Sequence, residues 1–135
     1  MISLVFCLRR LPTLTGAQFL DYWLNHHGPL VVARAPLLRM RRYQQLHRLD
    51  LPALAPVSEV RSAPEPYDGV AQVYWDSLDD LMLSGADSAA RKASRELLED
   101  EKQFIDLRAS PIFFTEAHVL VETAALTERF GRTEN

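Results

Sequence analysis

The sequence has few of the residues that crosslink small domains or bind metals and nucleotides. The 135-residue chain has one cysteine, Cys7, which excludes an intramolecular disulfide and a cysteine-based zinc site. Its five glycines are scattered, and none belongs to a Gly-rich loop that cradles phosphate groups. His26 and His27 are adjacent and so cannot converge on one ion from the same helix face. We therefore expect no metal and no nucleotide cofactor, and we expect Cys7 to be a buried strand thiol.

Long hydrophobic runs and an excess of positive charge are also absent. The N-terminal apolar run, residues 2–8, is too short for a membrane span and lacks a preceding basic region, so we expect a cytoplasmic protein without a membrane partner. The net charge of −3 argues against a general nucleic-acid-binding protein. Five arginines within residues 34–48 and five acidic residues within 96–106 are expected to form solvated or complementary faces. A phosphate-binding strip formed by those arginines is the alternative.

The chain does have the composition of a folded globular domain. Hydrophobic residues make up 47% and charged residues 24%, which is ordinary for a globular protein and excludes a mainly disordered chain. A chain of this length forms one domain and buries a sizeable core without a disulfide or a structural metal. We predict one domain over residues 1–122 and a polar tail over residues 123–135.

Hydrophobic periodicity and turn residues predict alternating strands and helices. Thr15 and Gln18 form a capping box that starts a helix, and Gly28-Pro29 should end it before a short helical piece. Residues 49–68 contain four of the eight prolines and are predicted to be an extended surface loop. The expected strands are 2–9, 39–48, 70–75 and 112–122, and the expected helical segments are 15–27, 30–35, one capped by Ser77, and 88–104.

This order predicts an α+β fold of the ferredoxin-like βαββαβ type, with an antiparallel four-stranded sheet and two helices on one face. The first, third and fourth strands have apolar residues on both faces, so the uncovered face needs a partner. Pairing two sheets in a homodimer would cover it and form a dimeric α+β barrel. The space between the sheets is then a natural pocket, and a small-molecule ligand is expected between sheet and helices.

Four segments resemble the motifs of the EthD-domain family. Residues 19–31, FLDYWLNHHGPLV, resemble its motif of an aromatic residue and Trp followed by His, a small residue and Pro-Leu. The other segments are Arg42-Tyr43 with Gln45 and His47, residues 68–71 with Tyr74-Trp75, and Asp100 with Phe104 and Asp106. The resemblance spans residues 1–122 and implies the dimeric α+β barrel. Similar barrels include cyclases, dehydratases, isomerases, cofactor-free monooxygenases and haem enzymes, so the resemblance does not select a reaction.

Four residues are candidates for acid/base chemistry. By its place in the motif, His27 is the family histidine; it should face the sheet, and the helix dipole at its C-terminus should favour its cation. Capping of helix carbonyls is the structural alternative. Tyr43 and His47 on the second strand, and His118 beside Glu116 on the fourth, could polarise a carbonyl. Asp100 and Asp106 are expected to cap helices or pair with arginines rather than to catalyse.

The expected ligand is a small, mostly apolar, oxygenated molecule. The candidate substrate-binding residues are Phe6, Tyr22, Trp23, Tyr74, Trp75, Phe114 and Glu116. One hypothesis is a cofactor-independent enzyme that uses histidine acid/base chemistry for cyclisation, dehydration, isomerisation or oxidation. The alternative is a binding or sensing module with the same pocket and no chemistry, and a third possibility is haem binding through His27 or His118. The sequence leaves open whether the protein is an enzyme.

Overall fold

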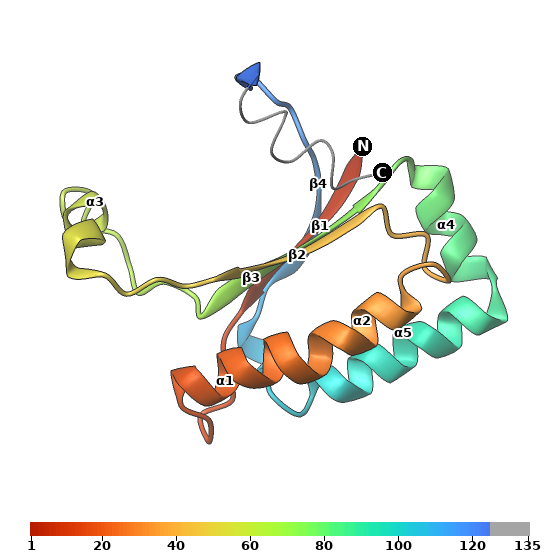
Figure 1. Cartoon of the computed structure of the whole chain (residues 1–135), viewed down its shortest axis with the longest axis horizontal. Helices are drawn as coiled ribbons and strands as arrows, with labels where there is room; N and C mark the ends of the chain where they lie inside the picture. The colour runs from red at the N-terminus through yellow and green to blue at the C-terminus, as the bar shows by residue number, and fades with distance from the viewer. Residues whose placement is uncertain (125–135) are drawn as a thin grey trace.

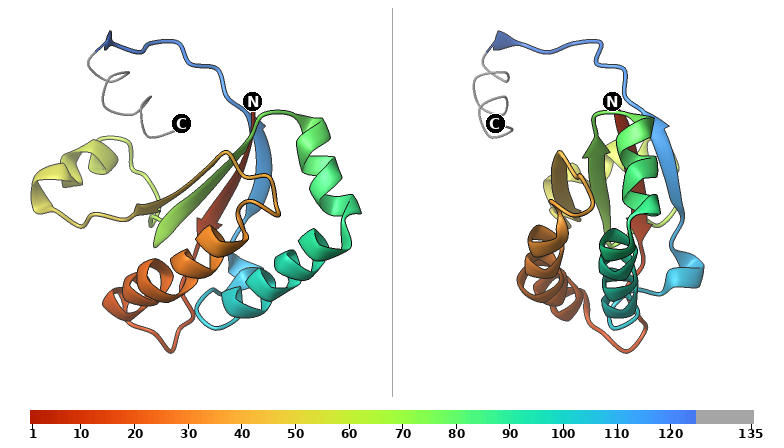
Figure 2. Two further views of the ribbon diagram at one scale, coloured as in Figure 1. Left: turned by 45° about the vertical axis from the view of Figure 1, so that its right-hand side comes forward. Right: turned by 90° about the vertical axis from the view of Figure 1, so that its right-hand side faces the viewer.

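The computed structural model describes residues 1–124 and contains one four-stranded antiparallel sheet with helices packed beneath it (Figure 1). The strands lie in the order β2-β3-β1-β4. Their bounds are β1 Ile2–Leu8, β2 Arg42–His47, β3 Gly69–Trp75 and β4 Ile112–Glu116. The helices beneath the sheet cover one of its two faces (Figure 2). The predicted βαββαβ fold is confirmed. Face-to-face pairing of two sheets stays a prediction.

The first helical segment is one continuous rod. It begins at α1 (Gly16–Tyr22), passes through the π-helical turn η1 (Trp23–His27) and continues as α2 (Gly28–Arg34). The capping box at its start is present, because the Thr15 hydroxyl accepts from the Gln18 amide while the Gln18 side chain accepts from the Thr15 amide. After β3, α4 (Leu78–Ala86) and α5 (Ser88–Glu101) complete the layer, and α5 lies beside α2 (Figure 2).

The prediction that Gly28-Pro29 ends the helix is wrong. Gly28 has ordinary right-handed helical angles, and its N–H donates to the Trp23 carbonyl. A proline lacks the N–H for the usual helical hydrogen bond, and its ring crowds the preceding turn. The wider π turn before Pro29 accommodates that ring without breaking the rod. His27 therefore lies inside a helix, so the C-terminal dipole argument for its cation does not apply.

Other sequence-based boundaries also differ from the structure. The second strand starts at Arg42 rather than residue 39, because the chain turns at Arg39, which has a φ of 58°. The loop at 49–68 contains two short helices, η2 (Pro52–Leu54) and α3 (Ala55–Glu59), on an arm that projects past the sheet (Figure 1). Pro52 and Pro56 stand in the first turns of these helices, where a missing N–H costs nothing.

The fourth strand is shorter than predicted. It ends at Glu116, which pairs with Ile2, the first residue of β1. Residues 117–122 therefore run past the β1 ladder, and His118 does not belong to the sheet. The predicted tail over 123–135 lies almost wholly outside the described residues. Within residues 1–124, no helix is long and apolar enough to cross a bilayer.

The core lies between the sheet and the helices in two clusters. One surrounds Trp23 and the fully buried Phe19 and Phe104. The other surrounds Val31 and the α5 residues Ala90, Ala93 and Leu97. Trp23 packs directly on β3: a Cβ added to Gly69 would lie 2.4 Å from the Trp23 ring, so only glycine fits there. This close contact anchors the helical rod on the sheet.

Candidate active site between sheet and helices

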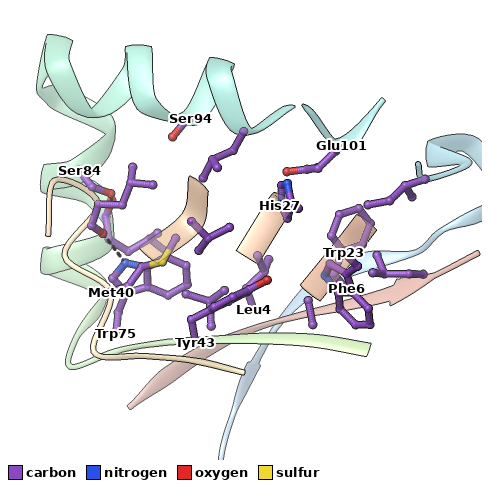
Figure 3. A pocket seen from close by; sticks show the side chains of 18 residues that line it. Leu4, Phe6, Trp23, His27, Met40, Tyr43, Trp75, Ser84, Ser94 and Glu101 are labelled. Carbon is purple, nitrogen blue, oxygen red and sulfur yellow. Dashed lines mark hydrogen bonds between the residues drawn. The ribbon is translucent and has the colours of Figure 1, made fainter. Parts of the chain in front are cut away.

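A cavity of about 260 Å³ lies between the two core clusters (Figure 3). Most of its wall is apolar and comes from β1, β3, α2, α4 and α5, including Phe6, Trp75 and Leu97. The polar side chains in the wall are His27, Tyr43, Ser84, Ser94 and Glu101. In Figure 3, His27 and Glu101 lie between Ser84 and Ser94 on the left and Trp23 and Phe6 on the right. Apolar walls with a few polar groups are typical of small-molecule sites.

His27 is buried and is held by a carboxylate from α5. Its Nδ1 lies 2.7 Å from Oδ2 of Asp100, although the two residues are 73 positions apart in the chain. Asp100 also accepts a hydrogen bond from the Tyr22 hydroxyl, with Oδ1 at 2.6 Å from the oxygen. The exposed His26 stacks on the Tyr22 ring and lies 3.4 Å from Oδ1. Asp100 thus joins the rod to α5 and orients the His27 ring.

The electrostatics of this group favour a neutral imidazole beside a carboxylate. Burial lowers the pKa of His27, and the opposing effect of Asp100 does not cancel it. Burial would raise the pKa of Asp100, but hydrogen bonds from Tyr22 and His27 outweigh it and hold that pKa below its usual value. Burial and the Asp100 carboxylate raise the pKa of Tyr22 to about 12. With Nδ1–H donating to Asp100, Nε2 of His27 keeps its lone pair and can accept a proton.

Glu101 follows Asp100 in the chain but lines the cavity. Burial and the neighbouring Asp100 raise its pKa to about 7. The sequence did show a signal for it: Ala90, Ala93, Leu97 and Glu101 continue one buried stripe of α5 at helical spacing. We expected Glu101 only as part of an acidic surface, so its place in the site was not predicted.

Tyr43 is the second predicted catalytic residue that reaches the cavity. Its hydroxyl accepts a hydrogen bond of 2.7 Å from Gln45 Nε2, and burial raises its pKa, so it stays a neutral hydroxyl. The same Gln45 amide donates to the Trp23 carbonyl, and Gln45 Oε1 lies 2.8 Å from His47 Nε2. His47 stacks on Trp23 with ring centroids 4.8 Å apart and lines an open groove rather than the cavity. Burial lowers the His47 pKa.

The remaining predicted site residues fall into two groups. Phe6, Trp23 and Trp75 line the cavity, and the Trp75 indole N–H donates to the Leu38 carbonyl. Tyr22 acts on the site through Asp100. Tyr74, Phe114, Glu116 and His118 are not brought to the cavity: Tyr74 bonds Gln72 on the open face, Phe114 is exposed, and the exposed Glu116 and His118 lie 4.0 Å apart.

His27 continues the buried stripe of Phe19, Trp23 and Val31 on the rod, whereas Leu24 is 54% exposed. The expected role of Asp100 needs correction. Asp100 binds Tyr22 and His27 rather than an arginine. The arginines of residues 34–48 and the acidic residues of 96–106 do meet at one point, where Arg34 donates a hydrogen bond of 2.6 Å to Glu96. Among residues 1–124, no three His, Cys, Asp or Glu side chains are grouped to hold a metal ion.

Comparison with protein families matches residues 11–108 to the EthD domain. The chain belongs to the EthD-domain family. The match contains the whole helical rod, Tyr43 and both Asp100 and Glu101. No curated protein matches the sequence of this EthD-domain protein.

Solved structures support the same fold. An EthD family protein from Bacillus halodurans superposes with a TM-score of 0.58 at 14% identity, covering 87% of this chain and 99% of that one. A dimeric protein of ferredoxin-like fold from Bacteroides fragilis has a TM-score of 0.54 at 9% identity, over 86% and 95% of the two chains. The cofactor-independent oxygenase SnoaB from Streptomyces nogalater has a TM-score of 0.51 at 15% identity, over 90% and 97%. At these identities the likeness concerns the fold alone.

Proposed function

We propose that this EthD-domain protein binds a small, mostly apolar, oxygenated molecule in the cavity and acts on it by proton transfer, with His27 as the general base. The observation that carries the proposal is the 2.7 Å contact between His27 Nδ1 and Asp100 at the wall of that cavity. A carboxylate that accepts from Nδ1–H sets the tautomer and leaves Nε2 basic. Asp100 is then a positioning residue.

The reactions under consideration share their first step. Isomerisation, dehydration, cyclisation and oxidation of an activated carbon all start with removal of a proton by a base. The apolar wall excludes water, so a proton taken by Nε2 is not lost at once to solvent. A cofactor-independent oxygenase has a similar fold. This supports the proposal that the side chains of such a fold can supply proton-transfer chemistry without a cofactor. Tyr43 on β2 lines the cavity, which supports a role for its hydroxyl as a hydrogen-bond donor to the ligand.

Deuterium exchange tests the proposal before the product is known. Neutral ketones and phenols that fit the cavity would be screened for thermal stabilisation, and bound compounds would be incubated with the protein in D₂O. We expect mass spectrometry to show deuterium entering the activated position. His27→Gln should slow this exchange about 10²- to 10⁴-fold while binding persists.

The adjacent histidine supplies the control. His26→Gln removes an exposed ring that lines no part of the cavity, so exchange should stay within about threefold of the parent protein. Binding without exchange in the parent protein would contradict the catalytic proposal and favour the binding or sensing module. Equal loss in both variants would show that His27 has no special role.

A further inference from the structure

The side chain of Glu101 is a carboxyl group in the cavity wall, and it has no role in proton removal by His27. It is the last residue of α5, and its backbone carbonyl accepts from the amides of Phe104 and Ile105. Its side chain makes no hydrogen bond to another described residue. The neighbouring Asp100 carboxylate is fully engaged by Tyr22 and His27. Two consecutive carboxyl groups therefore have different surroundings: one orients the imidazole, and the other faces the ligand space.

The surroundings of Glu101 disfavour its anion. No Lys or Arg belongs to the described wall of the cavity. The groups that face Glu101 are Asp100 on its own helix, His27 on the rod and Tyr43 on β2, and none of them supplies a positive charge when His27 is neutral. Glu101 also stands at the negative end of the α5 dipole. With a pKa of about 7, a carboxyl group in such a place is mostly protonated at pH 6 and has an O–H to donate.

We propose that Glu101 is the general acid that protonates a substrate oxygen while His27 removes a proton from carbon, and that the substrate is an uncharged carbonyl compound. This assignment rests on the proposed function of the cavity. It adds a second catalytic residue and a charge class for the ligand. A carboxylate or phosphate ligand would enter a wall that has no Lys or Arg and that contains the Glu101 carboxyl group, so we expect anions to bind poorly.

The proposed step balances without an oxidant or reductant. The C–H bond next to the carbonyl breaks, and its proton goes to Nε2 of His27. A C=C bond forms as the π pair of the C=O bond moves to oxygen, which takes the proton of Glu101. The products are an enol, a His27 imidazolium and a Glu101 carboxylate. Return of a proton from His27 to carbon, and of the enol proton to Glu101, restores both groups and gives the exchanged or isomerised ketone.

The test uses two probes of similar shape, cyclohexyl methyl ketone and cyclohexanecarboxylate. We expect the intact protein at pH 6 to bind the ketone at least about tenfold more tightly than the carboxylate, measured by NMR titration. In D₂O the bound ketone should exchange its α-hydrogens. Glu101→Gln can still donate a hydrogen bond but no proton, so it should keep the ketone affinity within about threefold while exchange falls about 10²-fold.

The variants separate this assignment from the function on which it rests. Exchange that is lost in His27→Gln but unchanged in Glu101→Gln would leave the base intact and overturn the role of Glu101. A ketone that binds without exchange in the parent protein would overturn the proposed function itself. Binding of the carboxylate but not the ketone, or of neither, would overturn the substrate class.

A measurement on the unliganded protein needs no substrate. The side-chain carboxyl ¹³C resonance of Glu101, followed from pH 4 to pH 9, should titrate with a pKa of about 7. Asp100, whose pKa is lowered, should stay ionised across the same range. Ionisation of Glu101 near the ordinary pKa of a glutamate would overturn the proposal even if a variant failed to fold.

Discussion

The two faces of the sheet differ in the side chains they present and in what covers them. The covered face carries Leu4, Phe6 and Val73 against the helices and encloses the cavity. The open face carries an apolar half, made of Val5, Cys7, Leu46, Val70 and Phe113. Its polar half is cross-linked by hydrogen bonds that join Arg42 to Gln44, Gln44 to Gln72, Tyr74 to Gln72 and Ser3 to Thr115.

The difference shows how one sheet can serve two purposes. Polar groups that already bond one another lose little when a partner surface excludes water from them. We therefore propose that a second copy of the chain covers the open face and that the few polar groups of the covered face contact the proposed ligand. One solved structure of similar fold is described as dimeric, which supports this pairing as a proposal for our protein.

The comparison is sharpest for two phenylalanines. Phe104 is 0% exposed beneath the sheet, whereas Phe113 on the open face is 48% exposed. Phe104→Ala leaves a cavity among Phe19, Tyr22 and His27 and should lower the free energy of unfolding by about 4 kcal/mol. Phe113→Ala should cost the isolated chain less than about 1 kcal/mol. Urea denaturation at low protein concentration measures both, and similar losses would contradict the distinction between the faces.

A smaller loss of unfolding free energy is expected for a substitution at Gly69, where the helical rod contacts the covered face. In Gly69→Ala the new Cβ would meet the Trp23 ring at 2.4 Å and the Leu46 carbonyl at 2.9 Å, so the helix must shift. We expect a loss of about 2 to 3 kcal/mol by thermal denaturation. Gly85→Ala is the matched control, because its Cβ meets nothing within 4 Å in α4 and should stabilise the helix by about 0.8 kcal/mol.

The open face is tested through the oligomeric state. Native mass spectrometry should give twice the 15.4 kDa chain mass if two sheets pair. Phe113→Asp would place a charge in that contact and should weaken the dimer by about 2 kcal/mol, roughly 30-fold. Leu98→Asp changes an exposed leucine of α5 and should leave the dimer intact. A monomeric parent protein would show that the open face is not covered in this way.

The smallest predicted effect is the pH dependence that Glu101 adds to stability. Its pKa is about 7 when folded, above the ordinary glutamate value of 4.5. A folded pKa that is raised gives stability that is complete below the unfolded pKa and is lost as pH rises to the folded one. Stability should fall between pH 4.5 and 7 by about 1 to 2 kcal/mol more in the parent protein than in Glu101→Gln, after allowance for solvent screening. Denaturation measurements that show the same change in unfolding free energy with pH in the parent protein and in Glu101→Gln would contradict the assignment.

Much of the fold follows from local features of the sequence. Alternating apolar residues set the strands, the Thr15 capping box starts the rod, and the EthD-like motif marks His27 and Tyr43 for the cavity. The wrong predictions arose where packing between distant residues outweighed a local sequence preference. Pro29 is a helix breaker in isolation, but a π turn and contacts with β2 keep the rod whole. The prolines at 52 and 56 start helices on the projecting arm instead of preventing them.

By itself, the sequence determined the order of the elements, the apolar faces and the family, because each depends on residues close together in the chain. Only the tertiary structure decided that Asp100 meets His27 and Tyr22 across 73 and 78 positions, and that His118 lies outside the cavity. Hydrogen bonds and burial between distant residues depend on how α5 packs against the rod and where β4 ends. No local periodicity contains that information.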